Sequence, residues 1–107
     1  MDSILQVKKE CYVCKATYNL HRHHVYFGYN RPVSEKNGFV VYLCLYHHEG
    51  TYGVHGKNGK DLNLKLKQIF QEKYEETHSR EDFIALIGQS YLDLEEEECQ
   101  KNTTNGN

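Results

Sequence analysis

Two short motifs gather cysteine and histidine at the spacing of metal ligands. Cys11 and Cys14 form a Cys-x-x-Cys pair, and Cys44 is followed three residues later by His47. Structural zinc sites are closed by four thiolate or imidazole ligands, and residues three apart on a helical turn share a face. The spacing therefore predicts a zinc site of Cys11, Cys14, Cys44 and His47. His48, four residues after Cys44, is an alternative fourth ligand that the spacing leaves open.

Histidine is concentrated in one part of the chain. Six of the seven histidines fall between residues 21 and 55, and they are His21, His23, His24, His47, His48 and His55. Imidazole is the commonest metal ligand, and because it changes its charge near neutral pH it also serves as an acid or a base in catalysis. The cluster predicts a second site, in which imidazoles hold a metal ion or transfer protons.

The elements that would position these residues follow from the pattern of side chains. Residues 10–19 are predicted to form a zinc knuckle, and residues 20–27 and 39–44, rich in β-branched and aromatic side chains, are predicted to form strands. Between them, turn-forming Asn, Pro, Ser and Gly predict a loop of about ten residues. Glycines from residue 50 onward limit the helix after residue 44 to one or two turns.

Two amphipathic helices are expected after residue 60. The first is indicated by apolar residues at three- and four-residue steps, which are Leu62, Leu66, Ile69, Phe70 and Tyr74. Ser79-Arg-Glu-Asp82 has the form of a helix cap and predicts a second helix that ends near Gly88. These helices are expected to cover the core or to form a homodimer contact. Residues 93–107, acidic and polar without a period, are predicted to be disordered, and Cys99 among them is not expected to be a ligand.

Length and charge limit the class of protein. A chain of 107 residues is predicted to be one small domain whose core needs a metal or disulfide to stabilise it. The chain has no apolar run of membrane-spanning length and no leader, which predicts a cytoplasmic protein that does not bind a membrane. Residues 1–67 hold ten Lys and Arg against five Asp and Glu, whereas residues 68–107 hold three against ten. The basic, histidine-rich first part is suited to contact the phosphates of nucleic acid.

The order of these motifs resembles the HNH, or His-Me finger, endonuclease pattern, and it looks most like that of small HNH-like proteins encoded by phages and prophages. The resemblance rests on Cys11-x-x-Cys14, His23-His24-Val25 and Leu43-Cys44-x-x-His47-His48, and it extends through SEKNG, GTYGVHG and SREDFIALIGQSYL. It implies one α+β domain over residues 1–92. In that domain a zinc-stapled ββα-metal core, treble-clef-like, occupies residues 20–56, and two C-terminal helices follow in a helical part over residues 60–92.

The same resemblance implies a function and roles for individual histidines. It implies metal-dependent hydrolysis of phosphodiester bonds in duplex or branched DNA. His24 would be the general base, and His23 and His48 would hold a catalytic divalent cation, Mg²⁺ or another. His47 is thereby left to the structural zinc ion. His55 is a further candidate ligand of the catalytic cation.

Two points of the motif stay open. The middle Asn of the family orients the base, and both Asn37 and Asn30 are candidates, with Asn37 closer to the family spacing. Successive strand residues face opposite sides of a sheet, so His23 and His24 can meet at one site only where the strand ends, twists or bulges. His21 shares the parity of His23 and is an alternative to it.

Other residues near these motifs could contact a nucleic acid. Phosphate groups could be bound by Arg22, Arg31, Lys36 and Lys57. Bases could stack on tyrosines, although most of these are expected to be structural; they are Tyr18, Tyr26, Tyr29, Tyr42, Tyr46 and Tyr52. Two other functions fit the same motifs. One is a non-catalytic zinc module that binds nucleic acid, and the other is a protein-binding or inhibitor module on an HNH scaffold.

Overall fold

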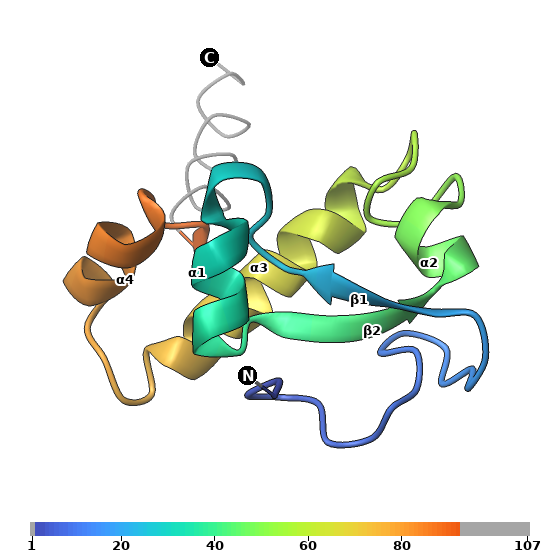
Figure 1. Ribbon diagram of the computed structural model, residues 1–107. Helices are drawn as coiled ribbons and strands as arrows, with labels where there is room; N and C mark the ends of the chain where they lie inside the picture. The colour runs from blue at the N-terminus through green and yellow to red at the C-terminus, as the bar shows by residue number, and fades with distance from the viewer. Residues whose placement is uncertain (1, 93–107) are drawn as a thin grey trace, which may run out of the picture.

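A two-stranded antiparallel sheet lies at the centre of the α+β fold (Figure 1). The computed structural model describes residues 2–92, and the tail predicted over residues 93–107 lies outside the described residues. Strand β1 (Leu20–His24) pairs with β2 (Val40–Cys44), with Leu20 opposite Cys44 and His24 opposite Val40. Both predicted strands are confirmed, although β1 ends at His24, three residues before the predicted end.

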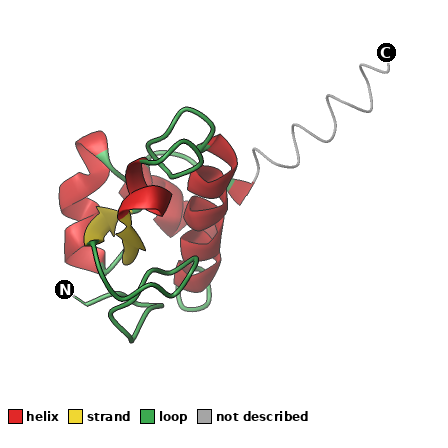
Figure 2. Cartoon of the chain, turned by 90° about the vertical axis from the view of Figure 1, so that its right-hand side faces the viewer, coloured by secondary structure: helices red, strands yellow, loops and turns green. Residues whose placement is uncertain are grey.

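Helices lie on both sides of the sheet, as Figure 2 shows. In the described residues they are η1 (Gly28–Asn30), α1 (Arg31–Asn37), α2 (Leu45–Glu49), α3 (Lys60–Tyr74) and α4 (Arg80–Ile87). The short α2 and the two C-terminal helices agree with the predictions. The predicted cap of α4 is also confirmed, because Ser79 Oγ accepts a bond from the Asp82 amide and Asp82 accepts one from the Ser79 amide. None of the helices within residues 2–92 has the length and apolar character required to cross a bilayer.

Helix α1 shows that the predicted loop between the strands is wrong. Pro32 lies in the first turn of α1, where the missing amide hydrogen costs no helical hydrogen bond. Gly38 ends the helix in the left-handed conformation with φ of 74°, and an added Cβ there would lie 2.5 Å from the Asp2 carbonyl oxygen. The Pro and Gly that indicate a turn are therefore the start and stop signals of a helix.

The core lies between the sheet and helices α3 and α4. Tyr26, just after β1, packs edge-on against Phe39 and near Phe83, with ring centres 5.3 and 5.5 Å away. Phe39 also packs on Phe70 of α3. The Tyr26 hydroxyl donates to the Lys67 carbonyl at 2.6 Å, so this buried tyrosine is structural, as predicted for most of the tyrosines. These contacts fix the chain at the end of β1, where the histidines of the strand lie.

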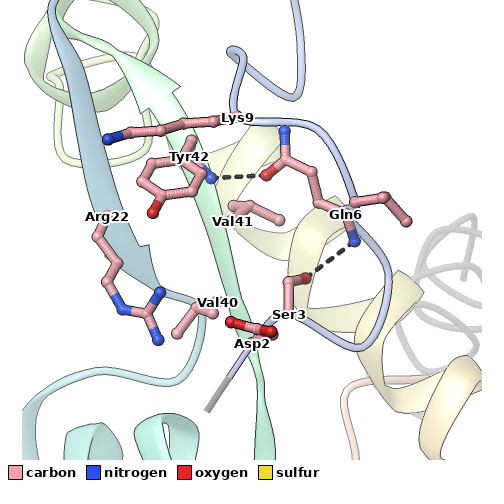
Figure 3. Close-up of a pocket in the computed structure, with 9 residues that line it drawn as sticks. Asp2, Ser3, Gln6, Lys9, Arg22, Val40, Val41 and Tyr42 are labelled. Carbon is pink, nitrogen blue, oxygen red and sulfur yellow. Dashed lines mark hydrogen bonds between the residues drawn. The ribbon is translucent and has the colours of Figure 1, made fainter.

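The N-terminal segment covers the free edge of β2. The Ile4 amide donates to the Gly38 carbonyl at 3.0 Å, and the Tyr42 amide donates to Gln6 Oε1 at 2.7 Å (Figure 3). The Tyr12 amide donates to the Tyr42 carbonyl at 2.8 Å. A cavity of about 380 Å³ lies between this segment and the strands, with Arg22 on one side (Figure 3). An edge covered in this way is protected from pairing with other chains.

Candidate metal centres

Cys11, Cys14, Cys44 and His47 converge at the end of the β1–β2 pair where α2 begins. Their ligand atoms all lie within 4.8 Å of one another. Cys14 Sγ and Cys44 Sγ are 3.8 Å apart, and His47 Nδ1 lies 3.3 Å from Cys44 Sγ and 3.7 Å from Cys11 Sγ. A tetrahedral zinc ion with bonds of about 2.3 Å to sulfur and about 2.0 Å to nitrogen separates its ligands by about 3.5–3.8 Å. The four residues can therefore hold a metal such as zinc.

Three local structures position these ligands. The Cys-x-x-Cys knuckle is closed by bonds from the Lys15 amide to the Cys11 carbonyl and from the Cys11 amide to the Ala16 carbonyl, at 2.9 and 2.8 Å. Lys15 takes a left-handed conformation, with φ of 69°, to make this tight turn. Cys44 ends β2, and His47 follows it in the first turn of α2. A metal ion here would join the N-terminal segment, the sheet and α2.

The thiols of this cluster differ in their electrostatic environments. Burial by itself would raise the pKa of the Cys11 thiol, but backbone amides of Cys14, Cys44 and Val13 lower it to about 6. The backbone amide of Ala16 lowers the pKa of Cys14, but desolvation and the neighbouring thiols outweigh it, so the net shift is upward. Thiolates repel one another, and a cation between them removes the repulsion and favours deprotonation of all three.

His23, His48 and His55 form a second cluster with ligand atoms within 4.8 Å of one another. The three rings pack edge to face, with centres 4.8–5.3 Å apart. His23 is buried and His55 is exposed, so the cluster opens to solvent on one side. Beside it lies a cavity of about 230 Å³ lined by Arg22, His23, His24, Phe27, Arg31, His48 and His55. The cluster contains the three residues that the sequence names as ligands of a second ion.

The loop after α2 folds back on the helix and brings His55 to His48. The Val54 amide donates to the His47 carbonyl and the His55 amide to the His48 carbonyl, both at 2.9 Å. Gly53 permits this approach, because an added Cβ would lie 2.6 Å from the His47 carbonyl carbon. The glycines that limit the length of α2 therefore also shape the histidine cluster.

His23 has the properties of a metal ligand. Burial, with further contributions from His55 and His48, lowers its pKa to about 3, so its ring is neutral and keeps a lone pair. Its Nε2 atom is buried and has no hydrogen-bond partner among the described residues. A buried nitrogen without a partner costs about 1–3 kcal/mol. This ring, together with those of His48 and His55, makes a set of three imidazoles that fits a cation that accepts nitrogen ligands.

His21 also contacts His48, and together with Glu49 these two histidines form a further group whose ligand atoms lie within 4.8 Å of one another. The Nδ1 atoms of His21 and His48 are 2.8 Å apart. This is a hydrogen-bond distance, shorter than the separation of about 3.3 Å between two nitrogen ligands on tetrahedral zinc. This contact engages His48 Nδ1 with His21 and leaves Nε2 as the other nitrogen of the His48 ring. Glu49 lies beside this pair, with Oε2 3.6 Å from His48 Nδ1.

The alternation of β1 sorts its side chains into two sets. His21 and His23 contact His48, whereas Arg22 and His24 contact Glu35 of α1. His24 is the last residue of β1, and its ring still lines the same cavity as His23. The two adjacent histidines thus share one cavity at the strand end, which answers the geometric question that the sequence left open.

Neither candidate asparagine lies at His24. Asn37 Nδ2 donates to the Val33 carbonyl of its own helix at 2.9 Å, and Asn30 Nδ2 donates to the Ile87 carbonyl at 2.9 Å. No hydrogen bond within residues 2–92 joins either side chain to His24. The side chain beside His24 is instead Glu35, which the sequence reasoning did not single out. Glu35 lies in the SEKNG segment, which the sequence predicted to be part of a loop.

The basic residues are divided among different surroundings. Arg31 is exposed and lines the histidine cavity, whereas Arg22 forms an ion pair with Glu35. Lys36 borders a different cavity, formed with the N-terminal segment and α3. Lys67, missed in the sequence, lies with Nζ 4.6 Å from the centre of the Phe27 ring, and burial lowers its pKa. Arg31 is thus an exposed cation at the cavity.

Replacing His55 with alanine is expected to weaken binding of Co²⁺ or Ni²⁺ at the histidine cluster by at least about tenfold, because loss of an outer-shell partner alone costs that much. The measurement is calorimetric titration of zinc-loaded protein, in which the cysteine site is already filled. His78→Ala, which removes an exposed histidine outside the cluster, should leave the affinity unchanged. Equal affinities in all three proteins would show that His55 is not a ligand.

No protein-family model matches the chain, and comparisons with curated proteins and solved structures give no significant match. The basis for a functional proposal is therefore the geometry of the two clusters and of the cavity beside His24.

Proposed function

We propose that this protein is a metal-dependent endonuclease of the HNH type, which hydrolyses phosphodiester bonds in DNA. The observation that carries the proposal is one cavity of about 230 Å³ lined both by the three rings of a candidate metal cluster and by His24. Phosphodiester hydrolysis needs a cation close to the phosphate and a base close to the attacking water. A cavity that holds both groups is suited to this reaction.

His24 is proposed as the general base. Its ring belongs to neither the cysteine cluster nor the histidine cluster, so no candidate metal site engages it. In the proposed step His24 takes a proton from water while the water oxygen attacks phosphorus and the bond from phosphorus to the leaving oxygen breaks. His24 is only 11 % exposed, which limits exchange of its proton with bulk solvent during the step.

His23, His48 and His55 are proposed to hold the catalytic ion. When bound, this ion would supply Lewis acidity for the charge that develops on the phosphate and the leaving oxygen. Three neutral imidazoles suit Zn²⁺, Ni²⁺ or Co²⁺, whereas Mg²⁺ prefers oxygen ligands. Of the divalent cations that the family resemblance allows, we therefore favour Zn²⁺, Ni²⁺ or Co²⁺ over Mg²⁺. The exposed side of His55 leaves room for a phosphate to approach.

The cysteine cluster is proposed to be a structural zinc site. It is closed by four protein ligands, as structural sites are, and His47 in it directly precedes His48 in α2. Zinc at this site would hold the helix turn that carries His48. DNA binding is supported by Arg31 at the cavity and by the ring of Tyr29, which is 96 % exposed and two residues before it.

The test is a cleavage assay with purified, zinc-loaded protein. Plasmid, branched and single-stranded DNA are incubated with Mn²⁺, Co²⁺, Ni²⁺ or Mg²⁺, beside a chelator control and His24→Ala protein. We expect nicking of at least one substrate that depends on the added ion, with Co²⁺ or Ni²⁺ more effective than Mg²⁺.

The outcome also separates the alternatives. If wild-type protein cuts none of these substrates faster than His24→Ala protein, the nuclease proposal is wrong. Salt-dependent DNA binding without cleavage would then favour the non-catalytic nucleic-acid module. Absence of DNA binding, together with tight binding of a protein partner, would favour the protein-binding module.

A further inference from the structure

We propose that Glu35 of α1 positions His24 and selects the ring nitrogen that acts as base, and that Arg22 holds Glu35 in place for this task. The catalytic part of this inference rests on the proposed function. It assigns the orienting role to a carboxylate on a helix, at a place where the sequence motif led us to expect an asparagine.

The contacts form a continuous chain from Arg22 to His24. His24 Nε2 lies 2.8 Å from Glu35 Oε1. On the other side, Arg22 donates from Nη2 to Glu35 Oε2 at 2.8 Å and from Nε to Oε1 at 3.3 Å. A guanidinium that grips both oxygens fixes the plane of the carboxylate, and the carboxylate in turn fixes the ring.

Helix α1 is tied to the end of β1 beside this chain. Ser34, fully buried, donates from Oγ to the Tyr26 carbonyl at 2.6 Å and accepts at Oγ from the Tyr26 amide at 3.0 Å. Glu35 follows Ser34 directly. Arg22 and His24 are two residues apart on β1 and therefore lie on the same face, toward Glu35. The two hydrogen bonds of Ser34 thus hold α1 close to the end of β1, where Glu35 can reach His24.

The charge of Glu35 decides which nitrogen of His24 carries the proton. The pKa of Glu35 is lowered to about 2, first by the hydrogen bond from Arg22 and next by that from His24. An ionised carboxylate only accepts hydrogen bonds. His24 Nε2 must therefore be the donor, and in the neutral ring the lone pair lies on Nδ1. The base in the proposed reaction is accordingly Nδ1.

A simple ion pair between Arg22 and Glu35 is the alternative explanation, and Glu35→Gln distinguishes the two. The amide has the shape of the carboxylate but only one accepting oxygen. If the amide oxygen of Gln accepts the bond from Arg22 Nη2, as Oε2 of Glu35 does, the amide nitrogen faces His24 Nε2 and donates to it. The ring proton then moves to Nδ1, and the base is blocked.

The experiment combines NMR with cleavage, on zinc-loaded full-length protein at a pH at which His24 is neutral. Long-range proton–nitrogen spectra show which nitrogen of His24 is protonated. We expect Nε2–H in the wild type and Nδ1–H in Glu35→Gln, with plasmid cleavage reduced about 10- to 100-fold and an unchanged zinc content. Glu35→Ala should also lose cleavage, and Glu72→Ala, at an exposed glutamate of α3, should change neither quantity.

The NMR and cleavage results test the positioning of His24 and its catalytic role separately. A wild-type ring protonated at Nδ1, or a Glu35→Gln protein with the tautomer and cleavage rate of the wild type, overturns the assignment of Glu35. A wild type without cleavage overturns the proposed function and the catalytic part of the inference. In that case the tautomers of the wild type and of Glu35→Gln still support or overturn the positioning of His24 by Glu35.

Discussion

Replacing Cys11 with serine is expected to unfold the domain. Serine removes a thiol from the cysteine cluster, of which Cys11 is the fully buried member. Structural zinc sites of this kind contribute about 10–16 kcal/mol of apparent binding free energy, which is coupled to folding. The whole stability of a small domain is about 5–15 kcal/mol, so loss of the ion exceeds what the core can supply. Zinc content and circular dichroism would both report the loss.

The matched control for Cys11→Ser is Val13→Ser. Val13 lies in the same knuckle, between the two cysteines, but it is 42 % exposed and belongs to no metal cluster of the described residues. Val13→Ser is expected to keep one tightly held zinc ion per chain and a cooperative unfolding transition. A chelator added to the wild type should reproduce the effect of Cys11→Ser. Cys11→Ser protein that stays folded and melts like the wild type would contradict a stabilising metal site.

The gathering of Cys11, Cys14, Cys44 and His47 could be predicted from the sequence because the positions of these residues are set by local rules. Cys11-x-x-Cys14 needs only a tight turn to bring its two sulfurs together, and Cys44-x-x-His47 needs only the end of a strand and one helical turn. The side-chain pattern indicated both the tight turn and the strand that leads into a helical turn. The structure brings the four residues together. Spacing alone did not separate His47 from His48. Geometry separates them, since His47 Nδ1 approaches the cysteine sulfurs and His48 contacts His21.

The surroundings of His24 could not be predicted in the same way. Local turn propensities indicated a loop between the strands, although Pro and Gly also mark the two ends of a helix. The choice is made by tertiary contacts, such as those of buried Ser34 with Tyr26, which are not visible in a local pattern. Once α1 is a helix, Glu35 faces His24, whereas Asn37 bonds to its own helix. The resemblance to the HNH motif supplied an asparagine as the expected partner of His24, and the predicted loop gave no reason to place Glu35 there.

Replacing His24 with alanine is expected to lower the rate of DNA cleavage by about 10²- to 10⁴-fold, the usual contribution of a positioned general base. Because His24 is outside both metal clusters, the variant should bind zinc and the second ion as the wild type does. The measurement is the rate of plasmid nicking at saturating Co²⁺ or Ni²⁺, together with the metal content of the protein. His78→Ala serves as the control for loss of an imidazole elsewhere, and it should nick at the wild-type rate.

Titration of the added ion separates a base from a ligand. His48→Ala removes a proposed ligand, so its activity should shift to higher ion concentrations and recover in part as the ion is raised. His24→Ala should show a wild-type dependence on the ion but a low rate at every concentration, because the missing group acts on water. If excess ion restored cleavage by His24→Ala protein, His24 would be a ligand and the base would have to be sought elsewhere in the cavity. The contrast between these two variants therefore tests whether His24 transfers protons while His48 binds the ion.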